Sequence, residues 1–294
     1  MSKILFTGAS GFLGSYITKA FQSSENELIK VGITDDSHIL SDISKEIPNL
    51  GDLQVDMLVH IAGKAHVIPK TEAEKKSFYD VNYEGTKNIV KALKFNPKSI
   101  VFISTVAVYG VETGENIKES DPLLGNTPYA DSKIKAENFL IEHCKTHKIN
   151  LVILRLPLIS GGNPPGNLGD MIKAIKKGYY FRIGNGEARR SIVAASDIAE
   201  LIPKLMDKNG VYNLTDNIHP TFKEIDSHIG LKYGIKIKTL PKWFLKIFAI
   251  IGDYIPKFPI NSLKFSKMTK SLTFSSEKAT RELGWNPKNS LSEI

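Results

Sequence analysis

Residues 7–14 read Thr7-Gly8-Ala9-Ser10-Gly11-Phe12-Leu13-Gly14. They lie between an apolar run, which predicts a buried strand, and a stretch whose apolar residues recur at helical spacing. In such a unit the first glycine allows a tight turn, the second lets the backbone approach a pyrophosphate, and the third lets helix and strand pack closely. Free N–H groups at the helix N-terminus also favour phosphate. We therefore predict that Gly8, Gly11 and Gly14 form a dinucleotide-binding turn rather than a merely structural one.

Strand and helix patterns alternate beyond this turn, which predicts βαβ units in a parallel sheet with helices on both faces. The expected fold class is α/β, a Rossmann doubly wound sheet with a smaller C-terminal α/β substrate lobe. The expected strands are Lys3 to Thr7, Glu27 to Ile33, Asp56 to Ala62, Ser99 to Ser104 and Asn150 to Leu156. Long helices are expected at about 72–95 and 129–147.

The pattern changes after residue 160, where glycines and prolines form a loop. We predict an NAD(P)-binding domain over residues 1–160, to which a segment near 190–215 returns as one more strand, Val211 to Leu214. Residues 161–294 are expected to form mainly the substrate-binding lobe.

The end of the second expected strand bears on the cofactor. Thr34, Asp35 and Asp36 follow that strand, and the first arginine of the chain is Arg155. Carboxylates without an arginine repel the 2′-phosphate of NADP, whereas a carboxylate suits the ribose of NAD. The sequence thus favours NAD, with Asp35 as a contact, and leaves NADP open because the Thr34 hydroxyl tolerates either cofactor.

A tyrosine–lysine pair begins the second long helix. Tyr129 and Lys133 are four residues apart and share a helical face, so the ammonium is expected near the phenol. A nearby cation favours the phenolate of a group whose pKa is near 10. Such a phenol can take a proton from a substrate hydroxyl as hydride leaves the same carbon. Ser104 and Thr105 supply a hydroxyl at the carboxyl edge of the sheet, where ligands bind in such folds.

Composition sets further limits. The chain has 294 residues, a net charge of +8 and one cysteine, Cys144, which we expect to be packing. We expect no metal site, no secretion signal and no nucleic-acid partner, because no helix-turn-helix, zinc or aromatic-basic pattern accompanies the charge. The apolar window Trp243 to Ile255 is too short to span a bilayer. A buried or lid helix is favoured there over interfacial contact with a membrane.

These motifs together resemble the extended short-chain dehydrogenase/reductase family, in its nucleotide-sugar epimerase/dehydratase branch (UDP-glucose 4-epimerase-like). The resemblance runs along almost the whole chain. It is carried by residues 7–14, Asp42-Ile43, His60 to Gly63, Val81 to Thr86, Ser104 to Gly110, Tyr129 to Lys133, Leu154 to Pro157, Arg189 to Ser191 and Leu283 to Pro287.

The resemblance implies roles for particular residues. Thr105, Tyr129 and Lys133 match a catalytic triad, with Thr105 preferred to Ser104 because it stands four residues before Tyr109. The implied cofactor contacts, beside the glycines and the triad, are Phe12, Leu13, Asp42, Ile43, Ile61, Ala62, Gly63 and Asn82. The implied substrate contacts, beside Thr105 and Tyr129, are Lys64 and two residues for a sugar-nucleotide diphosphate, Asn167 and Arg190.

The resemblance also narrows the activity. Val106-Ala107 stands where dehydratases carry an acid pair, which argues against dehydration. The leading expectation is an NAD-dependent UDP-hexose or UDP-N-acetylhexosamine 4-epimerase acting through a 4-keto intermediate in polysaccharide biosynthesis. The alternatives are an NAD(P)H-dependent 4-ketoreductase of a UDP-4-keto-6-deoxy-N-acetylhexosamine and a non-catalytic NAD(P)-binding scaffold. A cytoplasmic protein is expected, with a possible homodimer through the two long helices.

Overall fold

A seven-stranded sheet forms the centre of the molecule in the computed structural model, which describes residues 1–22, 25–255 and 261–294. The strand order is β11-β7-β5-β4-β1-β2-β3, and each pair of neighbours is parallel. The strands are β1 Lys3–Thr7, β2 Glu27–Gly32, β3 Ile39–Leu40, β4 Met57–His60, β5 Ser99–Thr105, β7 Asn150–Leu156 and β11 Gly210–Asn213. The predicted α/β, Rossmann-type fold is confirmed.

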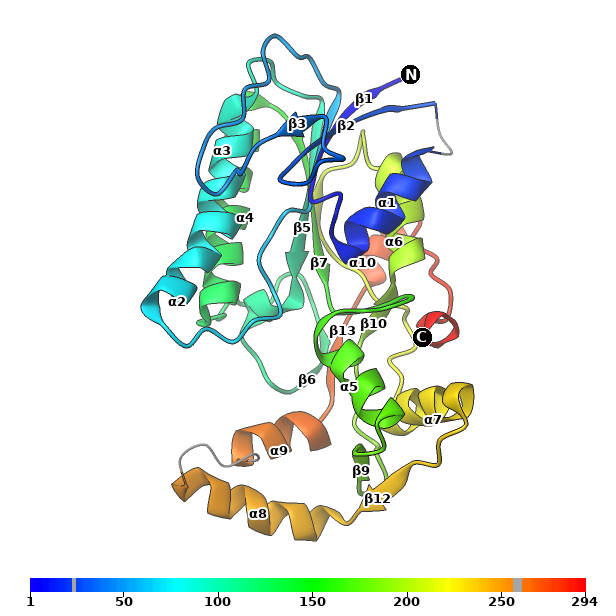
Figure 1. Ribbon diagram of the computed structural model, residues 1–294. Helices are drawn as coiled ribbons and strands as arrows, with labels where there is room; N and C mark the ends of the chain where they lie inside the picture. Colours follow the sequence, from blue (N-terminus) through cyan, green and yellow to red (C-terminus); the bar gives the residue numbers. More distant parts are fainter. Residues whose placement is uncertain (23–24, 256–260) are drawn as a thin grey trace.

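Helices cover both faces of this sheet (Figure 1). One face carries α2 (Glu72–Tyr79), the π-helical turn η1 (Asp80–Glu84), α3 (Gly85–Ala92) and α4 (Pro128–His147). The other carries α1 (Phe12–Gln22), α6 (Ala195–Leu201) and α10 (Glu277–Leu283). Successive side chains of β1 point to opposite faces of the sheet and enter both apolar cores. Ile4 and Phe6 pack under α1 and α6, whereas Leu5 packs toward α3 and α4.

Three two-stranded parallel sheets and four further helices complete the described part of the chain, and most of them lie after residue 157. The sheets pair β8 (Leu158–Ser160) with β10 (Ile192–Ala194), β9 (Phe181–Ile183) with β12 (Lys238–Leu240), and β6 (Gly114–Ile117) with β13 (Leu272–Phe274). The helices are α5 (Gly166–Lys176), α7 (Phe222–Tyr233), α8 (Lys242–Tyr254) and α9 (Ser262–Thr269). Short 3-10 turns lie at Val106–Tyr109, Ile202–Lys204 and Ser290–Glu293.

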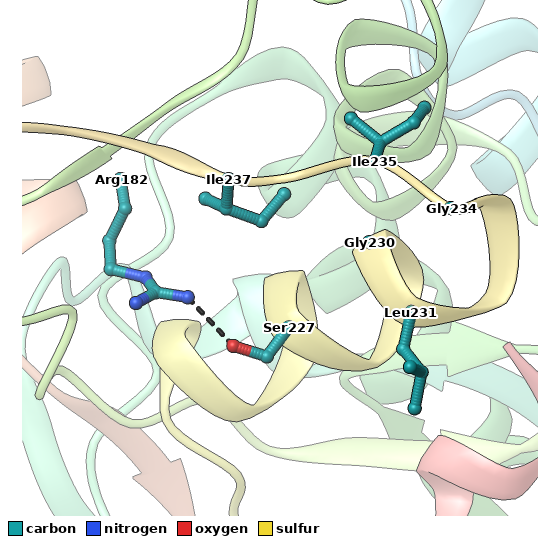
Figure 2. Close-up of a pocket in the computed structure, with 7 residues that line it drawn as sticks. All are labelled: Arg182, Ser227, Gly230, Leu231, Gly234, Ile235 and Ile237. Atoms are coloured by element: carbon teal, nitrogen blue, oxygen red, sulfur yellow. Dashed lines mark hydrogen bonds between the residues drawn. The ribbon is translucent and has the colours of Figure 1, made fainter.

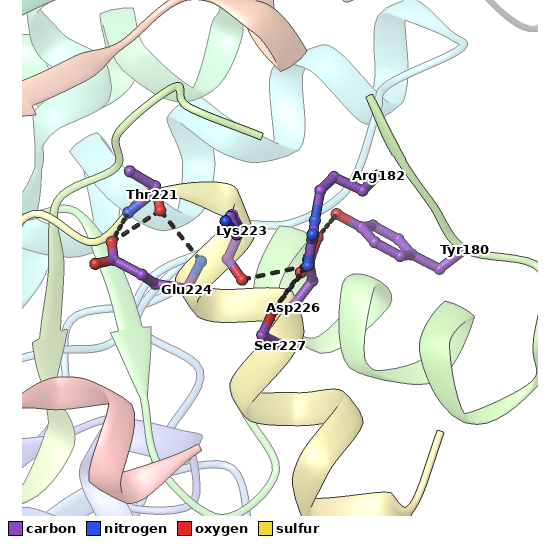
Figure 3. A network of polar contacts seen from close by, with 7 residues as sticks. All are labelled: Tyr180, Arg182, Thr221, Lys223, Glu224, Asp226 and Ser227. Atoms are coloured by element: carbon purple, nitrogen blue, oxygen red, sulfur yellow. Dashed lines mark hydrogen bonds and ion pairs between the residues drawn. The ribbon is translucent and has the colours of Figure 1, made fainter. Parts of the chain in front are cut away.

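An ion pair between the partly buried Arg182 and the buried Asp226 holds α7 against β9. The Arg182 Nε donates to Asp226 at 3.0 Å, and the Tyr180 hydroxyl donates to the same carboxylate at 3.1 Å (Figure 3). Beside this pair lies an open groove between α7 and the segment that leads to β12, lined by Leu231, Ile237 and their neighbours (Figure 2). No predicted catalytic residue lines this groove, so it has no part in the candidate active site.

Several segments differ from their predicted bounds. The strand expected at Val211 to Leu214 lies at Gly210–Asn213 and pairs with β7. The helix expected over 72–95 is divided by η1, and β3 is too short to have been foreseen. Cys144 is buried in a core, where burial raises the pKa of its thiol to about 12, as expected of a packing residue. The division of the chain at residue 160 stays a prediction.

The apolar window Trp243 to Ile255 falls almost wholly in α8. Of the two alternatives predicted for it, a buried helix is wrong, and nothing in the structure tests a lid helix. Of the residues in α8, Ala249 is buried, while most of the large apolar side chains are exposed. Helical periodicity identifies the helix but not which of its faces the rest of the chain covers. No helix within the described ranges is long and apolar enough to cross a membrane.

A buried ion pair fixes α4 on the sheet. The Arg155 guanidinium on β7 donates to the Glu137 carboxylate on α4 at 2.7 Å, and both side chains are almost fully buried. Arg155 also donates to the Tyr109 hydroxyl at 3.0 Å, which in turn donates to Asn213 on β11 at 2.8 Å. The Ser104 hydroxyl donates to Glu137. This network joins α4 to three neighbouring strands.

A second buried chain of hydrogen bonds ties the strand ends together. His60 at the end of β4 bonds through Nδ1 to the Thr7 hydroxyl at 2.6 Å and through Nε2 to the Thr86 hydroxyl at 2.9 Å. The Ala62 N–H donates to Thr7 at 3.3 Å. Burial, with a smaller contribution from the Lys133 charge, lowers the pKa of His60 to about 3, so its imidazole is neutral at ordinary pH.

We predict that Arg155→Met lowers the free energy of unfolding by about 3–5 kcal/mol, because it leaves the Glu137 carboxylate buried without its partner. The double variant Arg155→Met/Glu137→Met removes both charges and should regain most of that loss. Arg281→Met is the control, since Arg281 is exposed and pairs with Glu282 at the surface. Urea unfolding measures all three, and equal losses in Arg155→Met and Arg281→Met would contradict the prediction.

We also predict that His60 makes the protein less stable in acid. The unfolded chain protonates this imidazole near pH 6.5, whereas the folded protein does so only near pH 3. The unfolded state therefore binds more protons across this window. The free energy of unfolding decreases as the pH is lowered, by at most about 1.4 kcal/mol per pH unit. Between pH 7.5 and 5, His60→Gln should lose less stability than the wild type, and the exposed His38→Gln should lose the same amount as the wild type. Parallel pH profiles for His60→Gln and wild type would refute this assignment.

Candidate active site

The glycine turn leaves no room for side chains between β1, α1 and the end of β4. Gly8 has φ of +81°, and a Cβ there would lie 2.6 Å from the Ala62 nitrogen. A Cβ on Gly14 would overlap the Gly8 carbonyl oxygen. α1 begins at Phe12, so the unpaired N–H groups of its first turn follow this turn directly. The cradle fits a dinucleotide diphosphate, which needs close backbone approach and a helix N-terminus.

Three predicted catalytic side chains come from two adjacent elements. Thr105 ends β5, and Tyr129 and Lys133 lie on the first turns of α4. The Thr127 hydroxyl accepts from the Ala130 N–H at 3.2 Å, and Pro128 occupies the first helical position. This cap begins the helix one residue before Tyr129. The structure thereby brings the phenol, the hydroxyl and the ammonium to the carboxyl edge of the sheet.

The pKa values of the pair are set mainly by burial. Burial raises the pKa of the Tyr129 phenol, and a hydrogen bond with Thr105 lowers it by a smaller amount. Lys133 does not produce the lowering that its spacing predicted. Its Nζ donates to the Ile103 carbonyl at 2.9 Å and lies 4.5 Å from the centre of the Phe102 ring. Burial lowers the pKa of Lys133 to about 8, against a smaller raising effect of Glu137.

Asn82 lies in η1 and connects the residues after β4 to α4. Its side chain accepts from the Lys64 N–H at 2.7 Å and donates to the Lys64 carbonyl at 3.1 Å and to the Ser132 hydroxyl at 2.9 Å. A Cβ on Gly63 would lie 3.0 Å from the Asn82 oxygen and 3.2 Å from the Lys133 Nζ. Gly63, Lys64, Asn82 and Lys133 therefore meet at one place, and a π-helical turn is a frequent feature of such sites.

Phe78 and Ser132 belong to this site although their sequence context gave no sign of it. The buried Phe78 ring lies 6.1 Å from the Tyr129 ring and 5.7 Å from the Lys64 Nζ. The Ser132 hydroxyl accepts a hydrogen bond from the Asn82 side-chain amide and donates one to the Tyr129 carbonyl at 2.8 Å. Tyr and Lys at four-residue spacing were the local signal, whereas these contacts depend on how α2 packs on α4.

Other predicted cofactor contacts are spread around the same edge. Asp35 is exposed after β2, where its neighbour Asp36 bonds to Lys30 and Thr34, both at 2.7 Å. Asp42 accepts from Ser44, which contributes most to its lowered pKa. The remaining members are Ile43, which packs against Gly85, Leu13, which is buried in a core, Phe12, which packs on Tyr16, and the partly buried Ile61 and Ala62.

The predicted substrate residues Asn167 and Arg190 lie on two different segments. Asn167 is exposed on the first turn of α5, and a Cβ on its neighbour Gly166 would overlap the His66 ring, so this loop packs on the segment after β4. The Arg190 guanidinium donates to the Lys270 carbonyl at 2.8 Å and to the Lys267 carbonyl, at the end of α9. It lies 4.8 Å from the centre of the Phe222 ring, and burial lowers its pKa to about 10.

Comparison with known proteins places these features in a family. Residues 4–215 match the model of the NAD dependent epimerase/dehydratase family. The chain is 26% identical to a UDP-glucose 4-epimerase of Vibrio cholerae over 99% of this chain and 92% of that one. It is 28% identical to an N-acetyl-alpha-D-glucosaminyl-diphospho-ditrans,octacis-undecaprenol 4-epimerase of Escherichia coli O157:H7, over 94% and 88%.

A solved structure extends the likeness to three dimensions. The UDP-glucose 4-epimerase of Bifidobacterium longum, in complex with NAD+ and UDP, aligns over 100% of this chain and 96% of that one. The TM-score is 0.75 and the identity 21%, which supports a common fold. Because the family model covers the sheet, the glycine turn and the Tyr129/Lys133 helix, the chain belongs to the NAD dependent epimerase/dehydratase family.

Proposed function

We propose that this protein is an NAD-dependent 4-epimerase of a nucleotide-linked hexose or N-acetylhexosamine. One observation carries the proposal: Thr105, Tyr129 and Lys133 converge at the carboxyl edge of the sheet, beside the glycine turn and Gly63. The relatives named as 4-epimerases, and the Bifidobacterium longum structure with NAD+ and UDP, support this choice of cofactor and substrate class.

The residues suggest a division of the chemistry. NAD bound on the glycine turn would supply the reversible hydride acceptor that oxidation and re-reduction at the sugar C4 require. Tyr129 takes the proton of the sugar 4-hydroxyl and later gives it back, while Thr105 holds the same oxygen. Lys133, anchored by the Ile103 carbonyl, would hold the cofactor ribose. The cofactor's positive ring would offset the effect of burial on the pKa of Tyr129.

The remaining assignments are part of the same proposal. Gly8, Gly11 and Gly14, with Asp35, Asp42, Ile43 and the segment 61–63, hold NAD, and Lys64, Asn167 and Arg190 hold the sugar nucleotide. The exposed carboxylate of Asp35 favours NAD over NADP because it would repel a 2′-phosphate. The domain division at residue 160, the homodimer and the cytoplasmic location stay predictions.

A second substrate class has a specific observation in its favour. Arg190, the proposed diphosphate residue, is bonded to the end of α9, which packs against the exposed apolar helix α8. A diphosphate joined to a lipid rather than to a nucleoside would suit that neighbourhood, and the Escherichia coli O157:H7 relative is named for such a substrate. The proposal for this class keeps the same catalytic residues and changes only the group beyond the diphosphate.

We predict that the purified protein converts UDP-galactose or UDP-N-acetylgalactosamine to its C4 epimer, up to a fixed ratio, without added reductant. Tyr129→Phe should lower kcat by about 10²–10⁴-fold, because the proton acceptor is lost. Tyr233→Phe, a partly exposed tyrosine on α7, should keep wild-type kcat. Chromatography of the nucleotide sugars measures the turnover.

The outcomes separate the alternatives. If neither sugar changes but a UDP-4-keto-6-deoxy-N-acetylhexosamine consumes NADH or NADPH, the protein is a 4-ketoreductase. If only a polyprenyl-diphosphate-linked N-acetylhexosamine is epimerised, the lipid-linked class is correct. Binding of NAD without turnover of any of these substrates would leave the non-catalytic scaffold.

A further inference from the structure

One face of α8 presents a continuous apolar stripe to solvent. Trp243, Ile247, Ile250 and Tyr254 follow each other at helical spacing and lie on this face. Trp243 is 66% exposed and Tyr254 is 83% exposed. Ala249, on the opposite side, is buried, and α9 is the element packed against this helix. Figure 1 shows α8 at the end of the molecule farthest from the strand β1, projecting away from the main sheet.

The composition of this stripe suits the boundary between lipid headgroups and acyl chains. A contiguous exposed patch of large apolar side chains usually marks a surface that binds another protein or a membrane. The stripe has an aromatic residue with a polar handle at each end, Trp243 and Tyr254, and aliphatic residues between them. α8 is 13 residues long, which is too short to span a bilayer but sufficient to lie in its surface.

The charges around α8 point to an anionic surface. The described residues 236–255 and 261–270 contain seven lysines and one carboxylate, Asp253. That carboxylate accepts a hydrogen bond from the Ser262 N–H at 2.9 Å. Lys246 lies on α8 beside the stripe and Lys270 just after α9, whereas Lys242 pairs with Glu187 at 3.6 Å and Lys267 pairs with Glu112 at 2.9 Å. A second copy of the chain seated on this stripe would bring two sets of lysines together, whereas anionic headgroups would neutralise them.

We propose that α8, supported by α9, docks the protein on the surface of an anionic membrane, with the stripe Trp243, Ile247, Ile250 and Tyr254 at the headgroup–acyl boundary. Lys246 and Lys270 lie among the headgroups. The attachment is peripheral and does not depend on the proposed epimerase activity. It leaves the catalytic edge of the sheet outside the lipid, while Arg190, bonded to α9, stands between the two.

Flotation of the full chain with vesicles tests this docking. Vesicles of equal parts phosphatidylcholine and phosphatidylglycerol should carry the protein upward, and vesicles of phosphatidylcholine alone should carry much less. Ile247→Ser/Ile250→Ser should weaken partitioning at least about tenfold, because it removes apolar area from the stripe. The control Leu231→Ser removes an 85% exposed side chain from α7 and should float as the wild type does.

Tryptophan fluorescence gives an independent readout. The chain has two tryptophans, and Trp285 is 4% exposed in a core, so a blue shift on adding vesicles reports Trp243. Circular dichroism confirms that the variants are folded. Equal flotation of the double variant and wild type, or no flotation of the wild type, overturns the proposal. Absence of flotation together with a dimer that the double variant dissociates in light scattering would assign the stripe to a second copy instead.

Discussion

The buried pair of Glu137 and Arg155 is the constraint on which the candidate active site depends. Two opposite charges without water nearby must remain in contact, because separating them in a low-dielectric interior has a high free-energy cost. The pair therefore fixes α4 on β7 at one axial position. Lys133 and Tyr129 lie about one and two turns earlier on the same helix, so the contact also sets their height above the sheet. Through Tyr109 the same hydrogen-bond network reaches Asn213 on β11. The position of α4 at the site therefore depends on the strands β7 and β11 together.

Desolvation, more than any pairwise charge, sets the ionisation of the groups around this edge. Burial lowers the pKa of His60 and of Lys133, and it raises the pKa of Tyr129. The neutral imidazole can then serve as a fixed link between two hydroxyls, while the ammonium is held by a carbonyl and an aromatic face. A site poised in this way is sensitive to any charged molecule that enters it, because few charges of its own compete.

The sequence predicted the features that local spacing determines. The glycine turn, β1 and β7 lie at their predicted residues, since each depends on a run of neighbours and on nothing distant. The contact of Asn82 with Lys64 and Ser132 could not be predicted in this way, because it requires three segments to meet in space. Nor could the engagement of Arg190 with α9, where backbone carbonyls of no distinctive sequence are the partners. The same limit applies to α8. The spacing of its apolar residues predicts a helix, but it could not predict that most of their side chains are exposed.

The π-helical turn Asp80–Glu84 places one extra residue inside an otherwise regular helical segment. At about 100° per residue, this insertion rotates everything after it relative to everything before it. Phe78 consequently faces Tyr129, while Ile89, in the next helix, faces the sheet. Loss of a single residue here would straighten the segment and turn one of these two faces toward solvent. The number of residues between α2 and α3 is therefore more strongly constrained than their identities. Substitutions in this stretch should be tolerated more readily than insertions or deletions.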